Sequence, residues 1–105
     1  MNCKEHHDRA MHLASLADSE PDSDKRRELF LLASHNEHTA AEYAGSVEPS
    51  RSVLYRSAAW LALNGKRPEK ALKLAGCGLN GDEVPAEIRD ELIEVAKAAM
   101  SELTK

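Results

Sequence analysis

Apolar residues recur every three to four positions along most of the chain, which is the period of an amphipathic α-helix and not the period of two expected for a strand. The pattern is interrupted at four prolines and at the Asn-Gly pairs 64–65 and 80–81. Proline is well tolerated where a helix starts, and glycine is common just past its end. The pattern therefore predicts five helices, over about residues 3–17, 24–44, 50–64, 68–79 and 85–103.

Each predicted helix carries an apolar stripe that we expect to form the core. The stripes consist of Ala10, Leu13, Ala14 and Ala17, then Leu29, Phe30, Ala33, Ala40, Tyr43 and Ala44, then Val53, Leu54, Ala58, Leu61 and Ala62, then Ala71, Leu72, Leu74, Ala75 and Leu79, and finally Ile88, Leu92, Val95, Ala96, Ala99 and Leu103. Alanine-rich stripes let two helix axes approach to about 8 Å. Aromatic residues make up only 4% of the 105 residues, which disfavours a β-rich core. We therefore expect a single all-α domain over residues 1–105.

Two stretches of the chain, offset by 45 positions, show similar spacings of small and aromatic residues. The matched sets are Ala10, Leu13, Ala14, Ala17, Phe30 and Ala33 in the first, and Tyr55, Ala58, Ala59, Ala62, Ala75 and Gly78 in the second. This pattern resembles the tetratricopeptide family, whose two-helix repeats stack into an α-α superhelix. The run from Glu48 to Ala59 is similar to a motif in a group of small bacterial proteins of that kind. The resemblance implies two antiparallel helix hairpins closed by a capping fifth helix.

Charge is distributed unevenly along the chain. The net charge is −4 overall, which argues against general nucleic-acid binding. Residues 49–81 nevertheless carry a net +5, between acidic flanks of −5 over residues 1–48 and −4 over residues 82–105. Two hypotheses account for this distribution. Neighbouring helices neutralise one another's charge, or the basic segment meets an acidic protein or peptide partner.

The basic third helix contains most of the residues that we expect in a partner-binding face. In a tetratricopeptide-like hairpin the first helix lines the inner face, and arginine and tryptophan are common at binding hot spots. The candidate partner-binding residues are Arg51, Val53, Arg56, Trp60, Asn64, Met11 and Ser15. In the alternative hypothesis, Trp60 packs against the fifth helix and Arg56 pairs with an acid such as Glu48 or Glu91. The preferred function is a non-enzymatic protein-interaction or scaffolding module.

Five histidines and two cysteines suggest an alternative function as a metal-stabilised protein. Zinc requires three or four such ligands that converge on one point. The residues that we would assign to a structural zinc site are Cys3, His7, His35 and His38. The competing explanation is that these histidines are solvated polar residues, and on that basis we expect no cofactor.

Other patterns bear on enzymatic function and location. Residues Gly76–Gly81 read GxGxxG, but a helical run precedes them where a dinucleotide site requires a strand. The serines of the third helix have no histidine nearby in the sequence, so we predict that the protein is not an enzyme. No signal segment or membrane-length apolar run is present, and the cysteines form no CxxC pair. We expect a cytoplasmic protein with no nucleic-acid or membrane partner. A third hypothesis is a homo-oligomer that buries the second and fifth helices against a copy of the chain.

Overall fold

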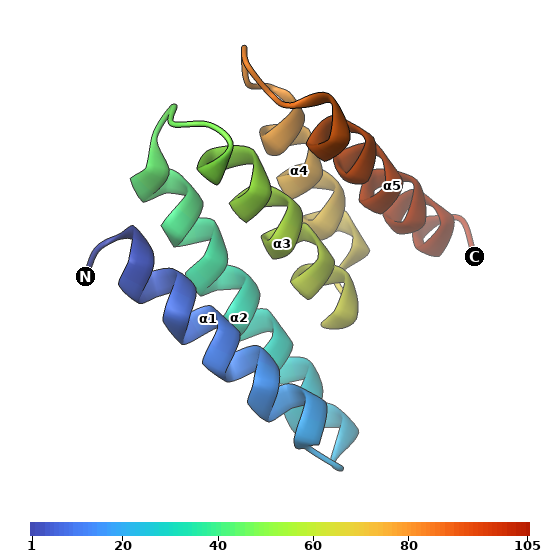
Figure 1. The fold of residues 1–105 in the computed structure, drawn as a ribbon. Coiled ribbons are helices and arrows are strands. Elements are labelled where there is room, and N and C mark those ends of the chain that lie inside the picture. Colours follow the sequence, from blue (N-terminus) through green and yellow to red (C-terminus); the bar gives the residue numbers. More distant parts are fainter.

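The computed structural model describes all residues from 1 to 105, and these form five α-helices joined by short turns (Figure 1). Helix α1 spans Cys3–Ser19, α2 spans Ser23–Ala44, α3 spans Ser50–Asn64, α4 spans Pro68–Leu79 and α5 spans Ala86–Leu103. The predicted all-α class is confirmed, and every helix end lies within two residues of its predicted position.

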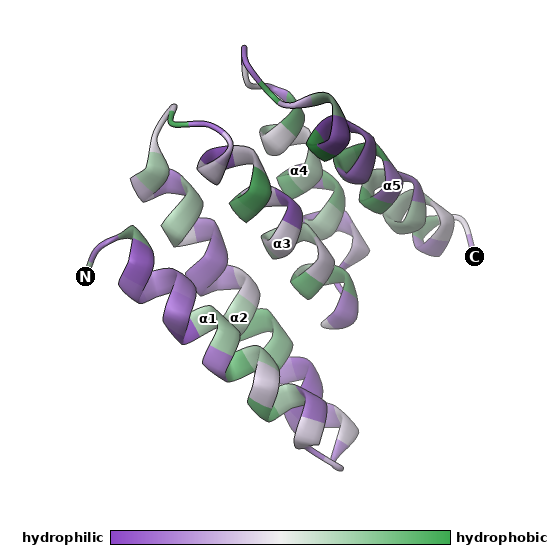
Figure 2. Cartoon of the chain, viewed as in Figure 1, coloured by the Kyte–Doolittle hydropathy of each residue, from purple (hydrophilic) through white to green (hydrophobic).

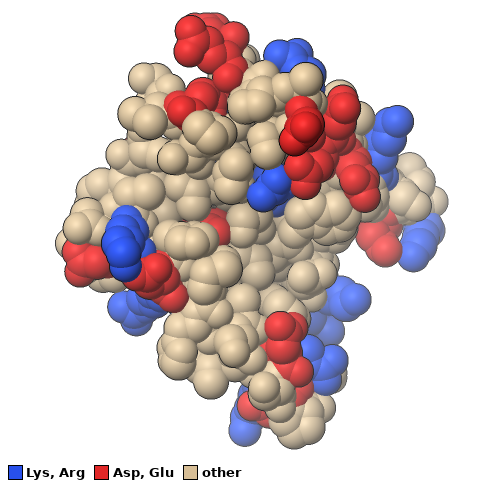
Figure 3. All heavy atoms as spheres, in the orientation of Figure 1, with Lys and Arg blue, Asp and Glu red and all other residues tan.

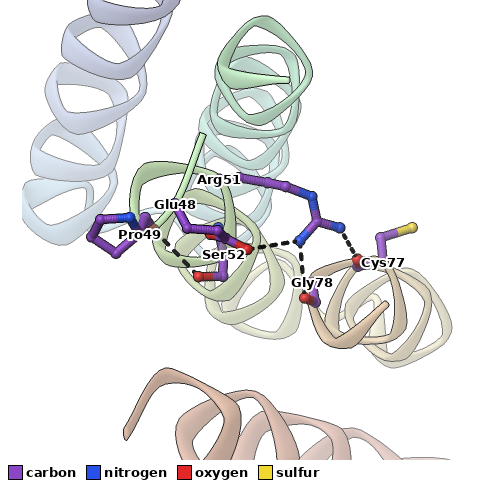
Figure 4. A network of polar contacts seen from close by, with 6 residues as sticks. All are labelled: Glu48, Pro49, Arg51, Ser52, Cys77 and Gly78. Carbon is purple, nitrogen blue, oxygen red and sulfur yellow. Dashed lines mark hydrogen bonds and ion pairs between the residues drawn. The ribbon is translucent and has the colours of Figure 1, made fainter. Parts of the chain in front are cut away.

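The five helices are arranged in two layers. Helices α1 and α2 form one antiparallel hairpin, α3 and α4 form a second, and α5 packs against both α4 and α3. In Figure 4, α1, α3 and α5 lie on one side and α2 and α4 on the other. The molecule is consequently a plate of 40 × 37 × 17 Å. The predicted order of two hairpins and a closing helix is the order that the contacts show.

Alanine fills the core wherever two helices approach closely. The largest buried cluster joins α3, α4 and α5 and consists of Ala58, Ala59, Ala62, Ala71, Leu74, Ala75, Val95 and Ala99. A second cluster consists of Ala17, Phe30, Ala33 and Leu61, and a third of Ala40, Ala41 and Leu54. Gly78 belongs to the same close packing, because a Cβ atom added there would lie 2.7 Å from Cδ2 of Leu92. The alanine-rich stripes therefore form the core, as predicted.

The buried side of α2 differs from the one that hydrophobicity predicts. Ser34 and Glu37 are wholly buried, whereas Tyr43, which we assigned to the core, is 60% exposed. Ser34 can be buried because its hydroxyl donates a 2.8 Å hydrogen bond to the carbonyl oxygen of Ala58. The core side of α2 is thus rotated toward these two polar residues and away from Tyr43. The prediction for Leu103 is also wrong, because this residue lies exposed in the last turn of α5.

The turn between α3 and α4 is a Schellman motif. The amides of Lys66 and Arg67 donate hydrogen bonds back to carbonyl oxygens in the last turn of α3. Lys66 takes the left-handed conformation, with φ of 63°, whereas Gly65, the residue expected to end the helix, has φ of −81°. Gly65 is needed for space instead, because an added Cβ would lie 2.7 Å from Cδ2 of Leu31.

Hydropathy varies from helix to helix, as Figure 2 shows. The first turns of α1 are mainly hydrophilic, whereas α4 presents a long hydrophobic side toward α3 and α5. None of the five helices combines the length with the apolar character that crossing a membrane requires.

Candidate functional site

Arg56 and Trp60, two of the residues expected at the centre of a binding face, make internal contacts. Nη1 of Arg56 lies 2.9 Å from Oε1 of Glu91, and the arginine side chain is only 25% exposed. Trp60 is half-buried against the core cluster formed by α3, α4 and α5. The Arg56–Glu91 pair is one that the alternative hypothesis named, whereas Trp60 packs against a cluster shared by three helices. The charge of Arg56 is already partnered within the protein.

Arg51 is also held within the protein, by a network of polar contacts (Figure 4). Its guanidinium group donates hydrogen bonds to the carbonyl oxygens of Cys77 and Gly78 in the last turn of α4. Nη1 also lies 3.5 Å from Oε2 of Glu48. Oε1 of Glu48 accepts the amide of Ser52 at 2.9 Å, which places a carboxylate at the N-terminus of α3, where the helix dipole favours negative charge. The network ties the start of α3 to the end of α4.

The other four candidate residues lie at separate places. Val53 is half-buried and lines a groove between α1 and α3. Met11 and Ser15 are exposed on α1, and they continue the line of His7 at intervals of one helical turn. Asn64 lines a hollow at the opposite end of the helices. The structure therefore does not gather all seven predicted residues, but it does leave three of them along the side formed by α1 and α3.

A groove of about 420 Å³ separates α1 from α3. It exists because both helices pack against α2 and scarcely touch each other. The residues that line it are Cys3, Lys4, His7, Ser50, Val53 and Leu54, and they present mainly carbon atoms. Figure 3 shows this side of the molecule, where charged side chains gather toward the edges and the middle is largely uncharged. The groove is suited to the apolar side chains of another molecule.

A wholly buried carboxylate lies behind one wall of this groove, and the hydrophobic pattern does not reveal it. Glu37 of α2 has no exposed surface, and its Oε1 lies 2.8 Å from Nδ1 of His7, whose side chain is 42% exposed. Oε2 of Glu37 is buried without a hydrogen-bond partner. An unpaired buried carboxylate costs several kcal/mol, so Glu37 depends on His7. The spacing of Glu37 from Ser34 and Ala41, at three and four positions, is the signal that would have indicated burial.

Three side chains of α1 and α3 have shifted pKa values. On α1, Nζ of Lys4 lies 2.6 Å from Oδ2 of Asp8, and this hydrogen bond lowers the pKa of Asp8 and raises that of Lys4. On α3, burial raises the pKa of Tyr55 above its usual 10.0, and the proximity of Cys77 adds to the shift. The guanidinium carbon of Arg51, 5.0 Å from the centre of the Tyr55 ring, opposes it. The phenol is therefore an uncharged group at physiological pH.

The four residues considered as zinc ligands do not converge. Cys3 and His7 line the α1–α3 groove, His35 is exposed on α2, and the ring of His38 lies 5.8 Å from that of Tyr55. No three histidine, cysteine, aspartate or glutamate side chains come together in a group that could hold a metal ion. The geometry does not support the zinc site suggested by the sequence.

The basic residues of segment 49–81 that form no ion pair all follow α3 in the sequence. The two arginines of α3 are held internally, and Nη1 of Arg67 lies 3.8 Å from the carboxylate of Glu69. The other three basic residues, Lys66, Lys70 and Lys73, form no ion pair. A groove of about 520 Å³ on the side of α2 and α4 is lined by His38, Glu69, Lys70, Lys73, Leu74 and Cys77. Neutralisation within the chain thus accounts for the three arginines and not for the three lysines, and the acidic partner stays a prediction.

No protein-family model, curated protein or solved structure matches the chain. The resemblance to the tetratricopeptide family therefore stays a prediction from the residue spacings.

Proposed function

We propose that the protein is a non-enzymatic interaction module that binds an amphipathic segment of a partner protein along α1 and α3. The supporting observation is the groove between these two helices, with its carbon-rich walls and its opening to solvent. Apolar side chains of the partner enter the groove beside Val53 and Leu54. Complete burial of one such side chain contributes about 1.5–3 kcal/mol, so two or three of them contribute about 3–9 kcal/mol before the cost of association. Micromolar binding, about −8.2 kcal/mol, therefore also requires contacts along the rest of α1 and α3.

The line of side chains along α1 extends this surface beyond the groove. Met11 is 39% exposed and lies one turn after His7, and Ser15 follows one turn later. A partner segment that lies parallel to α1 can contact all three of these residues. Arg56 instead joins α3 to α5 through Glu91, and Trp60 packs against the core cluster.

We place this module in the cytoplasm of a bacterium. The support for a reducing compartment is that Cys3 and Cys77 are both unpaired. The bacterial assignment rests on the resemblance of the Glu48–Ala59 run to a bacterial group.

A second candidate function, homo-oligomerisation, is favoured by the outer side of α5. Ile93, Met100 and Leu103 are all exposed there, and with Ala96 they have the alternating spacing of three and four residues that is typical of a helix–helix seam. Sedimentation velocity at increasing protein concentration tests this function. A dimer that dissociates in Met100→Glu supports it, and a monomer at every concentration rejects it.

The experiment for the preferred function starts from peptides selected for binding in a displayed random library and then synthesised. Their affinity is measured by calorimetry for the wild type, for Met11→Glu and Val53→Glu, and for the control Leu32→Glu. Leu32 is 52% exposed on α2, so this control adds the same charge outside the groove. We expect Met11→Glu and Val53→Glu to lose at least about tenfold in affinity and the control to bind as the wild type does.

Circular dichroism is used to check that each variant is folded. This check matters most for Val53, which is half-buried, so its substitution affects folding more than that of exposed Met11. The proposal is rejected if no peptide is selected. It is also rejected if the selected peptides bind Met11→Glu as tightly as the wild type.

A further inference from the structure

A second surface lies on the other side of the plate, between α2 and α4. We propose that this groove binds an acidic segment of a protein partner and that Lys70 and Lys73 pair with its carboxylates. This inference goes beyond the proposed function, because it concerns two other helices and specifies the charge of the segment that is bound.

The groove carries positive charge that no acidic residue of the chain pairs with. Lys70 and Lys73 stand three positions apart, so they project from the same side of α4. Neither forms an ion pair, and Glu69, the only acidic residue of segment 49–81, lies 3.8 Å from Arg67. The two ammonium groups therefore keep their charge available for an external carboxylate.

The groove between α2 and α4 is long enough to hold a short extended segment. Leu74, which is almost completely buried, forms an apolar floor beside the lysines. A neighbouring shallow, nearly flat surface shares Lys73 and Cys77 with the groove and continues past Gly76 to Asn80. The whole surface follows α4 for roughly 16 Å at the rise of an α-helix. Five residues of an extended chain, at about 3.3 Å each, match this length.

Gly76 leaves the surface open in its middle. A Cβ atom added there would meet nothing within 4 Å, so the backbone of α4 can be approached closely from outside. On the opposite wall, His38 of α2 adds an imidazole N–H donor. An acidic segment can thus be contacted from α2 and from α4 at once.

An acidic protein segment fits this charge better than a nucleic acid or a membrane does. The flanking segments carry net charges of −5 and −4, and they repel a polyanion that extends past α4. Anionic membranes are recognised by clusters of about four to eight basic residues, and nucleic acids by many phosphate contacts. Two lysines on one turn match a short run of carboxylates.

The test uses a fluorescent peptide of about 12 residues in which glutamate alternates with leucine, together with a peptide that has glutamine in place of every glutamate. Fluorescence anisotropy measures binding to the full-length protein at about 50 and 300 mM salt. The variant is Lys70→Glu with Lys73→Glu. The matched control is Arg89→Glu with Lys97→Glu, which makes the same change in net charge at exposed positions of α5.

We expect the α4 double variant to bind the glutamate peptide at least about tenfold more weakly than the wild type. The α5 control and Met11→Glu should bind it within about twofold of the wild type. The glutamine peptide should bind about tenfold more weakly, and high salt should weaken binding of the glutamate peptide alone. Should the α4 double variant prove unstable by circular dichroism, Lys70→Gln with Lys73→Gln gives the same comparison without charge reversal.

Several outcomes would overturn the inference. These are no binding of the glutamate peptide at about 1 mM, equal weakening by the α5 control, or equal binding of the glutamine peptide. Tighter binding to a single-stranded oligonucleotide, or to vesicles that contain phosphatidylserine, would overturn it in favour of those partners.

Discussion

The buried carboxylate of Glu37 depends on a single partner, and removal of that partner tests the structure directly. In His7→Leu, an apolar side chain covers Glu37 and cannot donate a hydrogen bond to it. Both oxygens of Glu37 are then without a partner, since Oε2 already lacks one. Loss of one partner of a buried ion pair costs about 3–5 kcal/mol, and one hydrogen bond to a charged group about 1.5–3 kcal/mol.

The exposure of His7 decides where in these ranges the effect falls. Its side chain is 42% exposed, so water reaches the edge of the site and replaces part of the lost interaction. We therefore expect His7→Leu to lower the free energy of unfolding by about 2–3 kcal/mol. For a domain of this size that corresponds to a decrease in Tm of roughly 10 °C.

Urea denaturation of a double-mutant cycle separates this effect from simple packing. Glu37→Met replaces the carboxylate with an apolar chain of similar length, which is often neutral or stabilising at a buried ion pair. In that background His7→Leu should cost less than about 0.5 kcal/mol, which gives a coupling energy near 2 kcal/mol. His7→Gln keeps an N–H donor and should retain part of the stability. Equal losses from His7→Leu in both backgrounds would refute the reasoning.

Three further predictions concern stability. Gly76→Ala should raise the free energy of unfolding, measured in urea, by about 0.5–1 kcal/mol. Gly78→Ala should lower it by about 1–3 kcal/mol, because its new Cβ would lie 2.7 Å from Leu92. Two changes of the same sign would contradict this packing. Lys66→Gly should raise Tm, because left-handed backbone costs a residue with a Cβ atom about 1–2 kcal/mol; an unchanged Tm would count against the strain at φ 63°. Burial raises the pKa of Tyr55, so the phenol ionises first in the unfolded chain and stability falls as the pH rises through 10. Tyr55→Phe should lack this part of the decrease in urea curves measured from about pH 9 to 11, and identical slopes would reject the assignment.

The helices could be predicted from sequence because their signals are local. An apolar period of 3.6 residues and the turn residues between the helices depend on neighbours within a few positions. The close helix packing at Gly78 could also be predicted, since small residues on the stripes of two successive helices indicate where the helix axes can approach each other. The burial of Glu37 and the exposure of Tyr43 could not be predicted from that pattern, because it assumes that polar residues face solvent and apolar residues face the core.

The candidate site was only partly predictable, for a different reason. The excess of positive charge in residues 49–81 identified a segment, but charge along a chain does not say which side chains turn inward. The partner of Arg56 is 35 positions away on α5, and that of His7 is 30 positions away on α2. Such pairs depend on how the hairpins stack, which the local pattern leaves open.

The thinness of the plate has a consequence for any protein that uses both of its faces. Glu37, which supports His7 at the α1–α3 groove, and His38, which lines the α2–α4 groove, are consecutive residues of α2. Two partners bound across a plate 17 Å thick would be held together at an effective concentration near the millimolar range. A displacement of α2 by either partner would also move the wall that the other contacts. By thermodynamic linkage, each partner would then change the affinity of the other by the same factor.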